Sequence, residues 1–118
     1  MNIAIDYQAR IPIYEQIVAE IEKMVALNIL QPGEKIATIR ELALTLGVNP
    51  NTIKKAYDIL EQKGVIISKS TKGTFIVDEV LQVKEAKIEQ VIGKINEYIG
   101  ELENIGLDRS EIKKRLKF

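Results

Sequence analysis

A short polar and basic segment, residues 49–55, holds the side chains of this sequence that are best suited to binding chemistry. It reads Asn-Pro-Asn-Thr-Ile-Lys-Lys. Asparagine is a favoured N-cap and proline is favoured in the first helical turn, so the segment predicts the start of a helix. Amide, hydroxyl and ammonium groups at such a helix end, together with its backbone N–H groups, can bind phosphate oxygens and the edges of bases. The segment is therefore a candidate contact with a nucleic acid.

The composition argues against catalysis. The 118 residues include no histidine and no cysteine, which removes thiol nucleophiles, disulfides, imidazole acid–base chemistry and the common zinc sites. The remaining carboxylates, lysines and hydroxyls are scattered, and no loop concentrates acidic residues at the spacing of a cation site. We therefore expect no enzymatic activity, no bound metal and no cofactor.

The charge is balanced overall but unevenly distributed. Lysine and arginine together number 17, as do aspartate and glutamate. Between residues 35 and 78, however, seven basic residues face four acidic ones, a net charge of +3. This is a modest positive footprint, compatible with binding to a polyanion but too small to identify one by itself.

Nothing in the sequence predicts a membrane protein. Residues 1–6 lack a basic region followed by an apolar run, and no apolar stretch approaches the ~18 residues that a membrane-spanning helix needs. We expect a cytoplasmic protein without a membrane partner.

Two helices are predicted before the candidate segment. Residues 12–30 show apolar side chains at helical spacing, and Pro32-Gly33 follows as a break. A short extended piece is expected over residues 34–37. Thr38 and Glu41 then have the spacing of a capping box, which begins a helix with Leu42, Ala43 and Leu46 on its inner face and Gly47 at its end.

The candidate segment itself begins a third helix, and a hairpin follows it. The third helix has a predicted inner face of Ile53, Ala56, Tyr57 and Leu60 and ends at Gly64. Residues 65–69 and 73–77 are rich in β-forming side chains and flank a polar turn, 70–72. Three helices followed by a hairpin predict a winged helix-turn-helix, in which the third helix enters the major groove of duplex DNA with its N-terminus first. The predicted contacts of this helix are Asn49, Asn51, Thr52, Lys54 and Lys55.

The chain becomes helical again from about Val80. Apolar residues fall seven apart in two rows, with two more beside them, and make a wide stripe on a helix of roughly 25 residues. Its members are Leu81, Ile88, Val91, Ile92, Ile95, Tyr98, Ile99, Leu102 and Ile105. A break at Gly106 precedes a short last helix that begins at Asp108 and turns Ile112 and Leu116 inward. Pairing with a second copy would cover the stripe, and folding back over the first helix of the same chain is the alternative.

Residues 11–77 resemble the DNA-binding domain of the GntR family of bacterial regulators. The matching pieces are Pro12–Ile17, Leu30–Ile36, Arg40–Ala43, Leu46–Ile53, Ala56-Tyr57, Leu60-Glu61, Gly64–Ile66 and Gly73–Ile76, in family-like order and spacing. The short chain, the Asn-Pro-Asn-Thr sequence and the helical tail are similar to the YtrA subfamily. That resemblance implies that a tail of two helices serves as a dimer interface.

The resemblance adds a second group of DNA contacts. Arg40 matches an arginine with which the family binds DNA, and the hairpin matches its wing, which implies contacts from Lys69, Ser70, Thr71 and Lys72. Two positions depart from the family. Thr71 stands where the wing usually has a glycine, which limits close approach to a groove. Lys54 stands where many relatives have arginine, which removes a bidentate donor.

These observations predict a mainly α fold with a small β wing, organised as an N-terminal winged helix-turn-helix (1–78) and a C-terminal two-helix dimerisation tail (79–118). The predicted function is that of a bacterial transcription regulator, a repressor that binds a twofold-symmetric site in double-stranded DNA as a homodimer. A winged helix used only for protein–protein assembly is the alternative, and the polar face around Asn51 and Lys54 argues against it. The sequence identifies no small-molecule effector.

Overall fold

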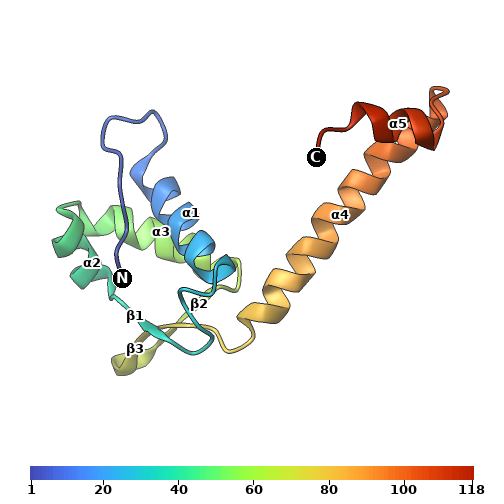
Figure 1. Ribbon diagram of the computed structural model, residues 1–118. Helices are drawn as coiled ribbons and strands as arrows, with labels where there is room; N and C mark the ends of the chain where they lie inside the picture. The colour runs from blue at the N-terminus through green and yellow to red at the C-terminus, as the bar shows by residue number, and fades with distance from the viewer. The chain divides into compact units, whose positions relative to one another are not determined.

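The computed structural model describes residues 1–118 and divides into two compact units, Met1–Val83 and Lys84–Phe118. Figure 1 shows the order of the elements along the chain. They are α1 (Ile13–Ala26), β1 (Lys35–Ile36), α2 (Ile39–Leu46), α3 (Pro50–Gln62), β2 (Ile66–Lys69), a 3₁₀ turn η1 (Ser70–Lys72), β3 (Gly73–Ile76), α4 (Val80–Asn104) and α5 (Arg109–Arg115). The predicted class, mainly helical with a small β wing, is confirmed.

The first unit is built around one hydrophobic core. The helices α1, α2 and α3 each turn an apolar face inward, and β2 and β3 cover the remaining side of the core. The side chains that are less than 2% exposed are Ile17, Ile21, Leu42, Ile53, Leu60, Ile66, Ile76 and Val80. All four residues predicted for the inner face of α3 are buried, which confirms the helical period read from the sequence.

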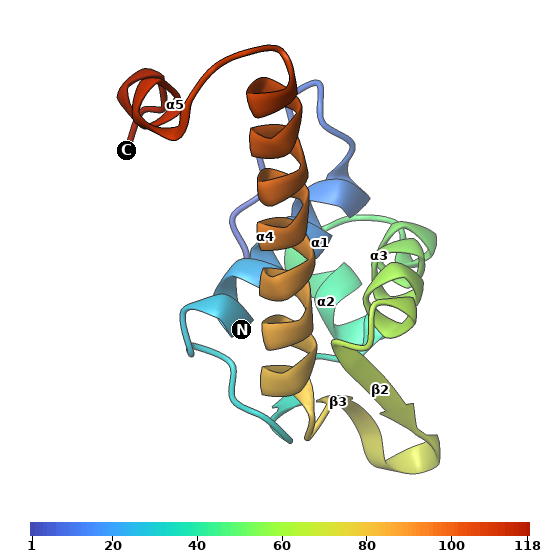
Figure 2. The ribbon, with the colours of Figure 1, turned by 90° about the vertical axis from the view of Figure 1, so that its right-hand side faces the viewer.

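The sheet is larger than the predicted hairpin. β2 and β3 pair antiparallel with Ile66 opposite Ile76, as expected, and Figure 2 shows them joined by a short turn. β1 adds a third strand on the other side of β3, with Lys35 opposite Phe75. The two residues of β1 are too few for a period-2 pattern, so only the pairing with β3 defines them as a strand.

The first helix is shorter than predicted. α1 ends at Ala26 rather than Leu30, because Asn28 adopts a left-handed conformation with φ +60°. The N–H groups of Ile29 and Leu30 both donate to the carbonyl of Met24, which closes the helix end. Leu30 is nevertheless buried in the core. Its apolar character therefore predicted its burial correctly but extended the predicted helix too far.

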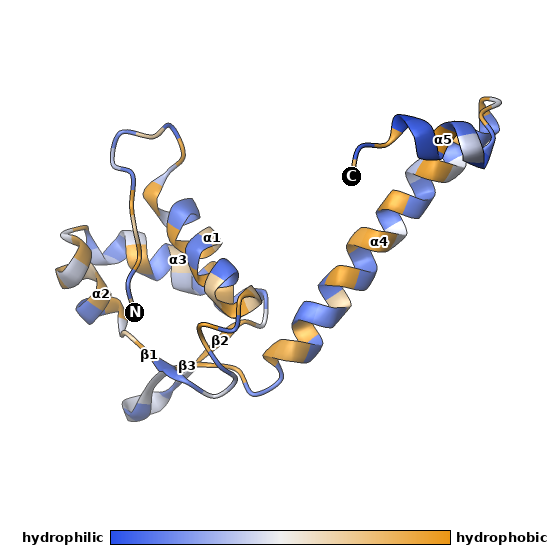
Figure 3. Ribbon diagram, viewed as in Figure 1, coloured by the Kyte–Doolittle hydropathy of each residue, from blue (hydrophilic) through white to orange (hydrophobic).

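The second unit consists of most of α4, a break and α5. Gly106 has φ +105°, and the carboxylate of Asp108 accepts a hydrogen bond from the N–H of Glu111 at 2.8 Å, so the break and the cap occur where the sequence predicts them. Ile112 is 3% exposed, whereas Leu116, also predicted to face inward, lies beyond α5 and is 41% exposed. Apolar bands recur along α4 in Figure 3.

Candidate nucleic-acid interface

The α2–turn–α3 segment is fixed by three local caps. The hydroxyl of Thr38 accepts a hydrogen bond from the N–H of Glu41 at 3.1 Å, and the carboxylate of Glu41 accepts one from the N–H of Thr38 at 3.3 Å. Gly47 ends α2 in the left-handed region with φ +65°. The side chain of Asn49 accepts from the N–H of Asn51 at 2.8 Å and begins α3. The predicted capping box, left-handed glycine and asparagine cap are all present.

These caps change which groups at the start of α3 are available to a ligand. Pro50 has no N–H, the N–H of Asn51 donates to the side chain of Asn49, and the N–H of Thr52 donates to the carbonyl of Asn49 at 2.9 Å. The backbone donors expected to meet a phosphate therefore already have partners. The exposed side chain of Asn51 and the half-buried side chain of Thr52 remain as donors on this turn.

The two lysines of α3 are held by neighbouring side chains. The ammonium of Lys54 lies 2.9 Å from a carboxylate oxygen of Asp58, one helical turn further on, and both side chains are about 60% exposed. The ammonium of Lys55 lies 4.0 Å from the centre of the Tyr14 ring on α1, a cation–π contact. Both contacts are at the surface and weak enough for a phosphate to replace. Asp58 was not predicted as part of the site, although its four-residue spacing from Lys54 was visible in the sequence.

Arg40 is another predicted contact whose side chain has no partner within the chain. It lies in the first turn of α2, is exposed, and forms no hydrogen bond or ion pair within the chain. The helix that carries it is held from α3, because the hydroxyl of Tyr57 donates to the carbonyl of Ala37 at 2.6 Å. Burial and the nearby negative charge of Glu41 raise the pKa of Tyr57 above its ordinary value, so this hydroxyl remains a donor.

The wing turn is tight despite its single glycine. Ser70 has φ +46°, which a residue with a side chain rarely adopts, and Gly73 has φ +123°. A side chain on Gly73 would meet Lys35, whose Cε would lie 2.8 Å from the added carbon. The ammonium of Lys69 lies 5.0 Å from the centre of the Phe75 ring, while Thr71 and Lys72 are exposed. The wing thus carries Lys69 on β2 and Lys72 on η1, and Lys35 on the neighbouring strand β1 lies close to the same turn.

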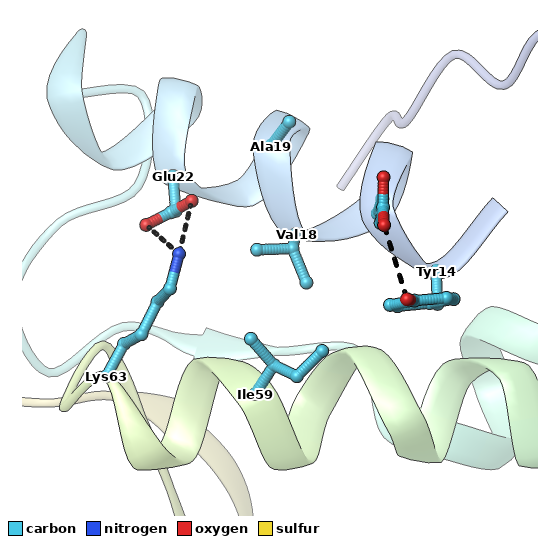
Figure 4. Close-up of a pocket in the computed structure, with 7 residues that line it drawn as sticks. Tyr14, Val18, Ala19, Glu22, Ile59 and Lys63 are labelled. Carbon is cyan, nitrogen blue, oxygen red and sulfur yellow. Dashed lines mark hydrogen bonds and ion pairs between the residues drawn. The ribbon is translucent and has the colours of Figure 1, made fainter. Parts of the chain in front are cut away.

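A shallow hollow of about 300 Å³ lies between α1 and α3, away from the first turn of α3. Figure 4 shows Val18 and Ile59 facing each other across it, with the Glu22–Lys63 ion pair (3.3 Å) at one end and Tyr14 at the other. No group of three or more acidic side chains could hold a metal ion, and no helix is long and apolar enough to cross a membrane.

The arrangement of three helices, a tight turn before the third, and a hairpin defines a winged helix-turn-helix protein. Comparison with known proteins agrees with that class. Residues 13–76 match the family described as "Bacterial regulatory proteins, gntR family". The chain is 31% identical over 116 residues to the HTH-type transcriptional repressor YtrA of Bacillus subtilis. The matched residues cover 98% of this chain and 89% of YtrA.

Solved structures show the same relationship. A transcriptional regulator from Oenococcus oeni superposes with a TM-score of 0.71 at 34% identity, covering 94% of this chain and 92% of the regulator. The AraR DNA-binding domain in complex with an operator superposes with a TM-score of 0.55 at 30% identity, covering 65% of this chain and 94% of that domain. The chain belongs to the GntR family of bacterial transcription regulators and is similar to YtrA along nearly its whole length.

The Tyr57 hydrogen bond should be measurable as stability. Tyr57→Phe leaves the carbonyl of Ala37 without a donor, and we expect the free energy of unfolding to fall by about 1 to 3 kcal/mol. Chemical denaturation measures this loss. The pKa of Tyr57 is raised in the folded state. The contribution of its hydroxyl to the free energy of unfolding is therefore present below about pH 10 and is lost as the pH rises further. Tyr14→Phe, which removes an exposed hydroxyl bonded only to Glu15, is the control and should change stability little. Equal effects of the two variants would contradict this account of Tyr57.

Proposed function

We propose that this protein is a transcriptional repressor that binds a twofold-symmetric operator as a homodimer. The observation that carries the proposal is the first turn of α3, where a rigid, capped helix end presents exposed polar side chains after a tight turn. Such a helix end fits the major groove, where side chains can reach base edges while basic groups bind the flanking phosphates.

The proposed contacts fall into two groups. Asn51 and Arg40 have free hydrogen-bonding groups and suit direct contact with bases, Arg40 through a bidentate pair with guanine or a phosphate. The remaining residues position the protein on the DNA backbone or border the groove, and they are Asn49, Thr52, Lys54, Lys55, Lys69, Ser70, Thr71 and Lys72. Asn49 also serves as the cap of α3, so its side-chain oxygen already accepts a hydrogen bond from the N–H of Asn51.

The proposed dimer contact is the apolar stripe that runs along α4 and ends at Ile105, one residue beyond the helix. Seven of its nine side chains leave between 41% and 79% of their surface exposed, and Ile99 and Leu102 are half-buried. An apolar stripe of this length is rarely left in water on a single helix, and a second copy would supply a matching surface. A dimer places two copies of α3 on successive turns of the duplex, which requires a symmetric operator.

Two relatives support the regulatory role. The YtrA protein of B. subtilis, which this chain matches over most of its length, is named as a transcriptional repressor. The AraR domain, which resembles the first unit, is bound to an operator. Repression would follow if the dimer occupies a promoter and excludes the polymerase.

The deciding experiment is selection of the purified protein against a random duplex DNA library at moderate salt, followed by sequencing. We expect enrichment of a twofold-symmetric site, with half-sites one helical turn apart or a multiple of it. Enrichment of a single half-site would contradict the dimer. No enrichment by a folded protein would contradict the operator-binding role and favour a winged helix that binds protein.

Arg40→Ala should weaken binding to the selected site by ~1–3 kcal/mol, because a base or phosphate loses its donor. Fluorescence anisotropy with a labelled duplex measures this change. Lys23→Ala, which removes a positive charge from α1 outside the proposed contacts, serves as the control and should bind nearly as well as the wild type. Arg40 would be a solvated surface residue if both variants bound alike.

Ile95→Asp should separate the dimer, because it places a charge in the middle of the apolar stripe. Light scattering should report a monomer, and affinity for the full operator should fall to that of one half-site as avidity is lost. Gln90→Asp adds the same charge on an exposed position of α4 outside the stripe and should remain dimeric. A dimeric Ile95→Asp variant would place the interface elsewhere.

A further inference from the structure

The first twelve residues, here called the N-terminal arm, are tied to the folded unit rather than free of it. Ile3 and Ile5 are partly buried against the core formed by the helices. Asp6 and Tyr7, which follow them, form hydrogen bonds with α1 and α2. No pattern in the sequence places this segment beside α2, because its contacts join residues far apart in the chain.

Tyr7 contacts the end of α2 through a single hydrogen bond. Its hydroxyl donates to the carbonyl of Leu46 at 2.5 Å, across 39 positions of sequence. Leu46 is the last residue of α2, where backbone carbonyls have no partner within the helix. Tyr7 is 59% exposed, so its ring is only partly buried and its hydroxyl makes the polar part of the contact.

Gln16 holds the other side of the arm on α1. Its side-chain oxygen accepts from the N–H of Asp6 at 2.9 Å, and its amide nitrogen donates to the carbonyls of Asp6 at 3.0 Å and Ile11 at 2.9 Å. Asp6 directly precedes Tyr7. A continuous series of hydrogen bonds and covalent bonds therefore runs from α1, through Gln16, Asp6 and Tyr7, to the last turn of α2.

As a result, α2 is held at both ends by tyrosine hydroxyls from other segments. Tyr57 of α3 donates to the carbonyl of Ala37 before the helix, and Tyr7 of the arm donates to the carbonyl of Leu46 at its end. The Tyr7 contact lies immediately before the turn Gly47–Asn49, and this turn sets where α3 begins.

We propose that Tyr7 is a positioning residue for operator recognition, which acts by holding the end of α2 and thereby the first turn of α3. Contacts with base edges require donors and acceptors to be placed within a narrow range of distance and angle, whereas attraction to phosphates tolerates displacement. Loss of the Tyr7 hydroxyl should therefore reduce specific binding more than non-specific binding. The inference rests on the proposed operator-binding function.

The test uses Tyr7→Phe in the full chain, which removes the hydroxyl and keeps the ring. We expect affinity for the selected operator to fall about three- to tenfold, the range for one hydrogen bond. Affinity for an unrelated duplex of equal length should stay close to that of the wild type, and the variant should remain folded at the temperature of the assay. Thr45→Val is the matched control, since its hydroxyl also donates to an α2 carbonyl, that of Glu41 at 2.9 Å, but from within the same helix.

Two outcomes of this binding measurement would overturn the proposal. Unchanged operator affinity in Tyr7→Phe would show that the hydrogen bond does not position α3. An equal loss on the operator and the unrelated duplex would make Tyr7 a direct phosphate contact instead.

A measurement without DNA separates failure of this proposal from failure of the operator-binding role. The N–H of Val48 donates to the carbonyl of Ala43 at 3.1 Å in the turn that Tyr7 is proposed to hold. Hydrogen exchange of this amide should accelerate several-fold in Tyr7→Phe and stay unchanged in Thr45→Val. If the wild type selects no operator but exchange accelerates in Tyr7→Phe, the operator-binding role fails and Tyr7 still holds the end of α2. Unchanged exchange would show, with or without an operator, that Tyr7 does not hold the end of α2.

A double variant tests whether the arm acts as one unit. Gln16→Ala releases the same arm from α1, so Tyr7→Phe added to it should cause little further loss of operator affinity. Fully additive losses would mean that the two residues act separately and would overturn the linkage from α1 to α2.

Discussion

Three residues, Gly47 to Asn49, join α2 to α3, and the placement of the proposed contacts of α3 relative to Arg40 on α2 depends on the conformation of this turn. Gly47 takes a left-handed conformation that other residues adopt at a cost, and Asn49 immediately caps the next helix. Because the connection is so short, the two helices cannot move independently. The buried faces of α2 and α3 then lock their relative orientation through Leu42, Ile53 and Tyr57 in one core. The residues proposed to contact DNA lie on the surface of α2 and α3, and the buried core fixes how these two helices are arranged.

In the proposed complex, the charges of the first unit would favour selectivity over strong general attraction to DNA. The whole chain has no net charge, and each lysine of α3 already has a partner, Asp58 for Lys54 and the Tyr14 ring for Lys55. In the proposed complex a phosphate would have to replace these partners, so each such contact would gain less than a free lysine does. The proposed contacts of Arg40 and Asn51 with bases would carry no such cost. Affinity would then depend more on geometry, and the hydrogen bonds that hold α2 would matter more.

Local chemistry made much of the fold predictable, and long-range contacts account for what was not. The capping box at Thr38, the left-handed Gly47 and the cap at Asn49 depend on residues within four positions, and each was predicted correctly. The end of α1 was wrong because Leu30 continues the apolar spacing after Asn28 has ended the helix. β1 and the Tyr7–Leu46 bond join distant segments, and no short pattern carries such information. For the candidate site, the residues of α3 were proposed from type and spacing, and Arg40 and the wing from the family resemblance. The contact of Lys55 with Tyr14 and the bond from Tyr57 to Ala37 became visible only in the packed structure.

The second unit raises a question of stability that the proposed dimer answers. Among its residues only Ile112 is buried, so the unit has almost no core of its own. Helix propensity alone contributes little, because most of the stability of a helix in a protein comes from packing of its apolar face, which offsets the loss of conformational entropy. Covering the stripe with a second copy would supply the missing apolar burial and make folding of α4 and dimerisation a single linked process. Its apparent stability would then rise with protein concentration. Because the proposed mode of operator binding uses both copies, protein concentration would control the folding of the tail and the occupancy of the operator together.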